Sequence, residues 1–266
     1  MKYDFTGKNV LITGASSGIG RQLAMKLAEK GANLIVVARR EDRLRRLAED
    51  VRGVQEKFGT GITVLPMDLG KDGACEALFE KLTRTRVDVL VNAAGFGKLG
   101  ASADIPIEKE MEMLRLNCEV LHRLTRLFLK PMLQRKNGLI LNVASAAGLL
   151  PAGPYLAAYY ATKAYVASYS RGLDRELCDR KCGVRVLSLC PGPVNTEFTA
   201  VAGGTEWEKG MSAAKCAGIA VRGMETGRRE TVIPGGAVRF GIFAARFLPK
   251  SLVSRVLGIY QRRKVL

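Results

Sequence analysis

Aromatic and metal-binding residues are scarce in this sequence. Phenylalanine, tyrosine and tryptophan make up 6% of the 266 residues, and His122 is the single histidine. The six cysteines are scattered and include no C-x-x-C pair. A zinc site needs closely spaced cysteine and histidine ligands, and disulfide frameworks belong to small secreted chains. The sequence therefore supports neither a metal site nor a disulfide framework, and we read His122 as a packed or interface residue.

Long apolar runs and domain linkers are also missing. No run approaches the roughly 18 apolar residues of a membrane span, and the first residues, MKYDFTGKNV, lack the apolar stretch of a signal peptide. No linker, repeat or low-complexity tract divides the chain. We therefore expect one domain over residues 1–266 in a cytoplasmic setting.

Acidic residues are few relative to basic ones. The chain has 25 Asp and Glu against 42 Lys and Arg, a formal net charge of +17. This charge would attract a nucleic acid, an anionic membrane surface or an acidic cofactor, and charge alone does not choose among them. Because the basic residues are spread over many segments without a recognisable reading motif, we expect no nucleic-acid binding.

Short apolar segments rich in β-formers alternate with stretches of helical spacing. The predicted strands cover residues 9–13, 34–38, 62–67, 87–92, 139–144, 184–190 and 231–234. Such alternation is typical of parallel strands joined by helical crossovers. The sequence therefore predicts an α/β fold, a Rossmann-type doubly wound seven-stranded parallel sheet with helices on both faces.

A glycine-rich segment, TGASSGIG, follows the first predicted strand and opens a helix. Glycines there let the backbone turn tightly and approach a pyrophosphate, whose charge is favoured at a helix N-terminus. A purely structural turn is the alternative. The candidate contacts to a dinucleotide are Gly14, Ser16, Ser17, Gly18, Ile19 and Gly20.

Two arginines follow the second predicted strand, where an enzyme that uses NAD usually has an acidic residue. Arg39 and Arg40 match the 2′-phosphate of NADP in charge and geometry. The alternative is that both are solvated charges at the start of a helix. We expect NADP(H) rather than NAD(H), with Arg39 as the first choice for the phosphate contact.

The ends of the third and fourth predicted strands supply further candidates, because ligands bind outside the carboxyl ends of parallel strands. Asp68, next to Leu69, could accept a hydrogen bond from the adenine amino group or serve as a helix N-terminal carboxylate. Asn92 begins the segment NAAG, in which Ala93 precedes the second alanine and Gly95 permits close approach of a ribose. An Asn-capped turn would look the same.

Tyr159 and Lys163 are four residues apart, hence on one face of a helix. A nearby ammonium stabilises a phenolate, so we expect it to lower the tyrosine pKa and let Tyr159 exchange a proton near neutral pH. Ser145, at the end of the fifth strand, could hold a substrate carbonyl oxygen, or could cap a turn. The adjacent Tyr160 points about 100° round the helix, which favours Tyr159.

These motifs together resemble the short-chain dehydrogenase/reductase family. The segment TGxxxGxG, a NAG-like tetrapeptide, a helix asparagine, a serine, YxxxK and PG occur in the family's order. The resemblance implies that Tyr159 is the general acid or base, that Lys163 lowers its pKa and bonds the nicotinamide ribose, and that Ser145 orients the substrate. Asn117 matches the asparagine that holds a water linking the lysine to solvent, or is a polar helix residue satisfied by backbone.

The resemblance extends to the segment after the sixth strand and to assembly. Pro191, Gly192, Val194 and Thr196 match the family segment that touches the nicotinamide carboxamide. The resemblance also implies a homodimer or homotetramer that pairs through the helices containing Asn117 and Tyr159. Two features depart from the family pattern: Ala93 replaces the usual second asparagine, and no basic residue precedes Gly18.

An apolar substrate is expected from the loops beyond the nicotinamide. Residues 146–158 are rich in apolar side chains, as are neighbouring loops that contain Phe96, Phe198 and Trp207. Residues 195–212 have weak periodicity, and we interpret them as a substrate lid. The chain resembles reductases of acyl, steroid and other lipophilic ketones more than sugar-specific members, although such loops would also be apolar if they packed on each other.

Residues 238–266 form a basic amphipathic extension in which phenylalanines and aliphatic residues alternate with Arg and Lys. One interpretation is a helix packed on the domain or in a dimer interface, which we favour. The other is peripheral contact with a membrane surface. The second belongs to an alternative function, a nucleotide-binding interaction protein that docks on a membrane or partner. The complete set of Tyr, Lys, Ser and Asn argues against that alternative.

Overall fold

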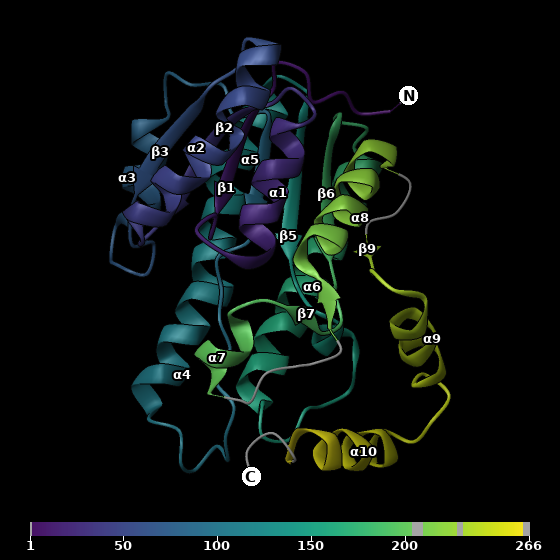
Figure 1. The fold of residues 1–266 in the computed structure, drawn as a ribbon. Coiled ribbons are helices and arrows are strands. Elements are labelled where there is room, and N and C mark those ends of the chain that lie inside the picture. The colour runs from purple at the N-terminus through teal and green to yellow at the C-terminus, as the bar shows by residue number, and fades with distance from the viewer. Residues whose placement is uncertain (1, 204–209, 228–230, 263–266) are drawn as a thin grey trace.

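One seven-stranded parallel sheet forms the centre of the computed structural model, which describes residues 2–203, 210–227 and 231–262. The strand order is β3-β2-β1-β4-β5-β6-β9 (Figure 1). The chain starts in the middle of the sheet, moves to one edge and then returns to build the other edge. This arrangement confirms the predicted doubly wound α/β fold.

The strands agree with the sequence prediction to within one or two residues at each end. They are β1 (Asn9–Thr13), β2 (Asn33–Ala38), β3 (Ile62–Pro66), β4 (Val89–Asn92), β5 (Gly138–Val143), β6 (Val184–Leu189) and β9 (Thr231–Val232). A two-stranded ladder of β7 (Val194–Asn195) and β8 (Met211–Ser212) was not predicted. Strands of two residues are too short to show a periodic pattern.

Helices connect the strands and cover both faces of the sheet. They are α1 (Gly18–Ala28), α2 (Glu41–Phe58), α3 (Ala74–Lys81), α4 (Ile107–Leu114), α5 (Leu121–Gln134), α6 (Ala157–Asp179), α7 (Phe198–Ala202), α8 (Ala213–Thr226), α9 (Gly236–Ala244) and α10 (Lys250–Arg262). A π-helix, η1 (Arg115–Val120), joins α4 to α5, and a 3₁₀ helix, η2 (Ala146–Leu149), follows β5.

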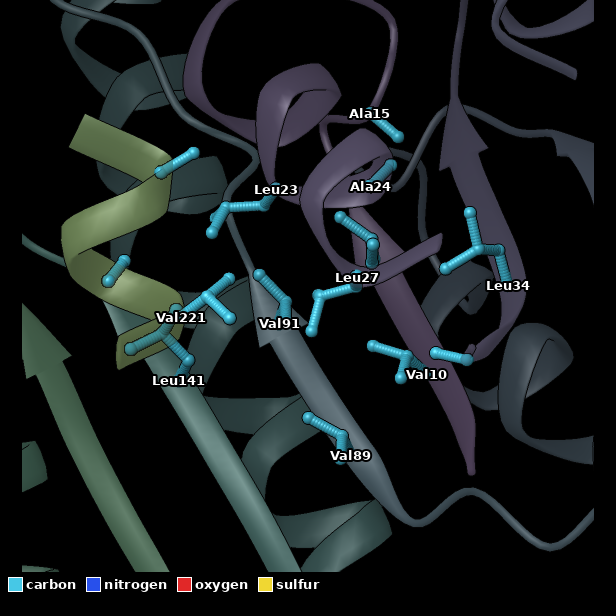
Figure 2. Packing of buried hydrophobic residues seen from close by; sticks show 14 of the residues in the cluster. Val10, Ala15, Leu23, Ala24, Leu27, Leu34, Val89, Val91, Leu141 and Val221 are labelled. Carbon is cyan, nitrogen blue, oxygen red and sulfur yellow. The ribbon is translucent and has the colours of Figure 1, made fainter. Parts of the chain in front are cut away.

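Alternation along each strand divides the core into two layers. Val10 and Ile12 of β1 face α1, α2 and α8, whereas Leu11 between them faces α3, α5 and α6. Figure 2 shows the first layer, in which Leu27 of α1 and Val221 of α8 lie over the sheet. Because the central strands are buried on both faces, they read as continuous apolar runs in the sequence.

The C-terminal region forms α9 and α10. Val253 and Gln261 of α10 are buried, and the Gln261 side chain donates a hydrogen bond from Nε2 to the Tyr160 hydroxyl at 3.1 Å. Gly258 lies against Pro154, so α10 packs on the loop that precedes α6. Among the described residues, no helix has both the length and the apolar composition needed to cross a bilayer.

Alanine substitutions at two helical glycines should change the free energy of unfolding in opposite directions. A Cβ at Gly20 would lie 2.4 Å from the Gly14 carbonyl oxygen, whereas a Cβ at Gly53 in α2 would meet nothing within 4 Å. We expect Gly20→Ala to lower the free energy of unfolding by about 2 kcal/mol, because backbone must shift. Gly53→Ala should raise it by about 0.5–1 kcal/mol. Urea titrations measure both, and equal effects of the two variants would contradict this packing.

Candidate active site

The carboxyl ends of four adjacent strands form the edge on which the candidate residues gather. Thr13 of β1 pairs with Asn92 of β4, Asn92 with Asn142 of β5, and Asn142 with Ser188 of β6. The four segments that follow these strands therefore emerge side by side. They are the glycine-rich loop, the NAAG segment, the segment that begins at Ser145 and the segment that begins at Pro191.

The glycine-rich loop is compact and leads into an open helix N-terminus. Gly14 and Gly18 have φ angles of +67° and +54°, and a Cβ at Gly14 would lie 2.7 Å from the Ala94 nitrogen. The first turn of α1 has no acidic residue, and Ser17 at its N-cap makes no side-chain capping bond. Free N–H groups and the positive end of the helix dipole favour an anion. The loop thus fits a dinucleotide pyrophosphate.

Thr13 holds the NAAG segment against this loop, a role that the sequence analysis did not assign. Its hydroxyl oxygen accepts hydrogen bonds from the Ala93 and Ala94 backbone nitrogens, both at 3.2 Å. Ala93 contributes no polar side chain, so the threonine fixes the turn in its place. In the sequence, the one indication of this role is that Thr13 is the first residue of the motif TGxxxGxG.

The two arginines after β2 have different surroundings. Arg40 donates hydrogen bonds to the hydroxyls of Ser16 and Ser17 and forms an ion pair with Glu197, 2.9 Å away. Glu197 also pairs with Arg43. Arg39 is exposed and forms no hydrogen bond or ion pair within the described residues. With Asp68 it borders a cleft of about 1200 Å³ whose other lining residues come mainly from α4, η1 and α5. Arg39 is therefore the cation left available for a phosphate.

Asp68 and Leu69 lie at the end of β3. The Asp68 carboxylate accepts a hydrogen bond from the Gly70 backbone nitrogen at 3.0 Å, which closes a turn while the residue still lines the cleft. The Leu69 side chain is buried in the core layer of α3, α5 and α6. Any cofactor contact by Leu69 must therefore come from its backbone.

The Asn92 side chain is held by neighbouring elements, so the predicted cofactor contact at Asn92 would have to come from its backbone. This side chain is buried, and its Nδ2 donates to Thr125 of α5 at 3.1 Å and to the Asn142 side chain at 2.9 Å. It also does not cap the NAAG turn, which was the alternative. Only the backbone of Asn92 and the following residues, including Gly95, borders the site.

Tyr159, Lys163 and Ser145 lie together at the start of α6 and the end of β5. The Lys163 ammonium donates to the Val143 carbonyl at 2.9 Å and lies 5.8 Å from the centre of the Tyr159 ring. The Ser145 hydroxyl accepts from the Ala147 nitrogen at 3.1 Å, so it caps η2 as the alternative interpretation proposed. It also contacts the tyrosine hydroxyl, so capping does not remove it from the site.

Burial sets the protonation of this pair. It raises the pKa of Tyr159 to about 12, with a smaller opposing effect from the Ser145 hydroxyl. It lowers the pKa of Lys163 to about 8. The pKa of Tyr159 is therefore raised and not lowered as expected, because burial outweighs the stabilisation that the Lys163 ammonium gives to a phenolate. With its pKa raised, Tyr159 holds its proton at neutral pH.

Asn117 lies in the π-helix η1 and is almost fully buried. Its side chain accepts from the Phe96 nitrogen at 3.0 Å and donates to the Phe96 oxygen at 2.8 Å and to the Thr162 hydroxyl at 3.1 Å. A Cβ at Gly95 would lie 2.7 Å from the asparagine oxygen and 3.5 Å from the Lys163 nitrogen. Asn117 thus fixes the loop beside the lysine, and its side chain is satisfied by protein groups.

The segment after β6 closes the other side of the site. The Pro191 carbonyl accepts from the Ala146 nitrogen at 2.8 Å, and a Cβ at Gly192 would meet Val238 of α9 at 2.6 Å. Thr196 follows Val194 of β7, and a Cβ at Gly18 would lie 3.2 Å from its methyl group. The segment therefore runs past the glycine-rich loop. The half-buried Ile19 packs on the core beneath it.

Part of the expected lid lies directly against Tyr159. Phe198 of α7 contacts Tyr159, with ring centres 5.2 Å apart, and both belong to an apolar cluster that includes Leu99 and Leu257 of α10. Trp207 lies outside the described residues.

His122 lies apart from this cluster. Its ring shares a hydrogen bond of 2.7 Å with the Tyr165 hydroxyl and stacks on Tyr169.

A family model described as short chain dehydrogenase matches residues 8–207. The chain belongs to the short-chain dehydrogenase/reductase family. A very-long-chain 3-oxoacyl-CoA reductase-like protein of Arabidopsis thaliana is 34% identical over 195 residues, which cover 72% of this chain and 61% of that protein. The chain thus spans about three fifths of the length of that relative.

Solved structures of the family share the fold over nearly the whole chain. A short-chain dehydrogenase from Sphingobium yanoikuyae in complex with NADPH has a TM-score of 0.80 at 30% identity, and the match covers 93% of this chain and 95% of that one. A bulky-bulky ketone specific alcohol dehydrogenase from Comamonas testosteroni has a TM-score of 0.74 at 29% identity, over 90% and 92% of the two chains.

Replacing the buried lysine should stabilise the fold at neutral pH. The Lys163 pKa falls from its usual 10.5 to about 8, so between these values the unfolded chain holds a proton that the folded protein has lost. The free energy of unfolding of the wild type therefore increases as the pH rises from about 8 to 10.5. We expect Lys163→Met to raise the free energy of unfolding by about 1–3 kcal/mol at pH 7 and by less at pH 10.

Urea titrations of wild type and variant at the two pH values measure this difference. Lys130→Met, at an exposed position of α5, is the control and should change stability little at either pH. A loss of stability in Lys163→Met of equal size at both pH values would contradict the assignment of a buried, strained ammonium.

Proposed function

We propose that this protein interconverts a lipophilic ketone and a secondary alcohol with NADP(H), with Tyr159 as general acid and base. One observation carries the proposal. Tyr159, Lys163 and Ser145 meet at the same strand edge as the glycine-rich loop, in a chain whose family consists of oxidoreductases. A protein that only bound a nucleotide would not need this set of groups beside the loop.

The residues at the edge divide the chemistry among them. A bound nicotinamide cofactor would supply or accept the hydride. Tyr159, protonated at neutral pH, donates its proton to the carbonyl oxygen during reduction, and Ser145 donates a hydrogen bond to the same oxygen. Lys163 supplies positive charge that stabilises the resulting phenolate. Asn117 keeps the loop beside Lys163 in place.

The glycine-rich loop and Arg39 support NADP(H) as the cofactor. The loop opens α1 without a side-chain capping bond from Ser17, and a Cβ at Gly14 would collide with the neighbouring backbone. The charge of Arg40 is already shared with Glu197, whereas Arg39 is unpaired within the described residues. A 2′-phosphate would give Arg39 an anionic partner that NAD does not have. Asp68 follows the neighbouring strand β3, and we infer that its carboxylate accepts a hydrogen bond from the adenine amino group.

A lipophilic substrate is supported by the surroundings of Tyr159. Phe198, Leu99 and Leu257 pack around it, and Leu156 and Ala202 belong to the same cluster. The similar proteins include one named for a very-long-chain oxoacyl thioester and one named for bulky ketones. Large apolar groups beside a carbonyl would find matching surfaces here.

Self-association through α4 and α6 accompanies this proposal. Ile107 and Met111 of α4 and Tyr165 of α6 are large apolar side chains with exposed fractions of 61%, 55% and 40%. They lie on the helices next to Asn117 and Tyr159, where family members pair. Burying them in a homodimer or homotetramer would remove an apolar patch from water.

Two adjacent tyrosines offer a matched test of the catalytic assignment. Tyr159→Phe should lower the rate of NADPH consumption with lipophilic ketones by at least about 1000-fold, because the proton donor is lost. Tyr160→Phe should leave most of the rate, because its hydroxyl bonds Gln261 of α10. A screen of ketones and acyl thioesters, followed by absorbance of the reduced cofactor, provides the assay. Equal rates in the two variants would refute the assignment.

The cofactor assignment has its own matched pair of arginines. Arg39→Ala should weaken NADPH binding by about 10- to 100-fold and leave NADH binding unchanged, since only NADPH has the 2′-phosphate. Arg46→Ala, an exposed position on α2, should alter neither affinity. Fluorescence titration of the reduced nucleotides measures both constants. If Arg39→Ala weakened the two nucleotides equally, the phosphate contact would be assigned to the wrong residue.

A further inference from the structure

The helices α9 and α10 and the segment that joins them expose an unusually large set of apolar side chains. Phe240, Phe243 and Phe247 have exposed fractions of 73%, 56% and 74%. On α10, Leu252, Val256 and Ile259 recur at intervals of four and three residues, so they form one stripe, and each is about half exposed. We call these six side chains the apolar face. Exposed apolar residues gathered on two consecutive helices mark an interaction surface.

The charges on these two helices and on the segment between them have one sign. Residues 236–262 contain five basic residues, Arg239, Arg246, Lys250, Arg255 and Arg262, and no Asp or Glu. On α10, Arg255 and Arg262 are seven residues apart, so they follow one flank of the apolar stripe, while Val253 and Gln261 on the opposite flank are buried. An apolar face bordered by cations fits a partner that is apolar inside and anionic at its surface.

We propose that the apolar face lies in the surface of an anionic bilayer, with the five basic residues at the level of the lipid headgroups. Phenylalanines and aliphatic side chains would enter the boundary of the acyl chains, and each Arg or Lys near the headgroups would be attracted to the lipid phosphates. The contact is peripheral, since none of the described helices could cross the bilayer.

Charge complementarity argues against a second copy of this chain as the occupant. In a twofold contact the same patch faces itself. The five cations of one α9–α10 pair would then face the five of the other, and residues 236–262 offer no carboxylate to pair with them. Burial of unpaired like charges opposes such a contact, whereas lipid phosphates neutralise them.

The same two helices border the active site with their inner faces. Leu257 of α10 belongs to the apolar cluster around Tyr159, and Gly258 lies against Pro154. Val238 of α9 packs on Gly192 in the segment after β6. Figure 1 shows α10 across the end of the molecule that also carries α7. Resting on the proposed function, this placement lets a lipophilic ketone pass from the bilayer to Tyr159 along apolar side chains.

Vesicle sedimentation of the full chain tests the docking without any measurement of turnover. The probes are vesicles of phosphatidylcholine alone and vesicles with about one third phosphatidylglycerol. Wild type should bind the anionic vesicles, bind the neutral ones at least about tenfold more weakly, and lose affinity as salt is raised. The double variant Phe243→Ser/Phe247→Ser should lower the partition coefficient on anionic vesicles by at least about tenfold.

The matched control is Phe58→Ser, because Phe58 is an exposed phenylalanine of α2, far from the apolar face along the chain. It should leave vesicle binding unchanged. Circular dichroism and thermal melting check that each variant is folded. Absence of vesicle binding, or equal losses in the control and the double variant, would overturn the proposal. So would light scattering that showed a wild-type oligomer, not bound to vesicles, which the double variant converts to monomers.

Discussion

The buried ammonium of Lys163 is the constraint on which the active-site geometry depends. Its hydrogen bond to Val143 ties the start of α6 to the end of β5, and this tie places Tyr159 beside Ser145. Burial costs the charged lysine stability, which its lowered pKa records. A fold selected only for stability would place an apolar side chain at this position. The charge is retained where a phenolate would form, which is typical of the compromise between stability and function.

Much of this architecture could be predicted from the sequence. The seven strands of the sheet were predicted because buried parallel strands are continuous apolar runs with turn residues at their ends. The spacing of Tyr159 and Lys163 placed them on one helix face, and Ser145 at a strand end placed it at the same edge. The amphipathic pattern after residue 238 indicated helices, but only the structure shows that Gln261 reaches Tyr160 and that the phenylalanines remain exposed.

Features that depend on three-dimensional surroundings could not be predicted. The proximity of Lys163 suggested a lowered pKa for Tyr159, yet burial outweighs the stabilisation that the ammonium gives to a phenolate. Asn92 resembled a ligand because it follows a strand, but its side chain bonds residues on neighbouring elements. The positioning roles of Thr13 and Asn117 could not be predicted, because their side chains bond backbone groups that are remote in sequence.

The central claim is that this edge of the sheet transfers a hydride between NADP(H) and a lipophilic carbonyl compound. Its most direct test supplies NADPH with deuterium at the transferable position of the nicotinamide, together with a lipophilic ketone, and analyses the alcohol by mass spectrometry. We predict one deuterium on the new carbinol carbon. An alcohol without deuterium, or the absence of alcohol from every ketone while NADPH binds tightly, would contradict the claim.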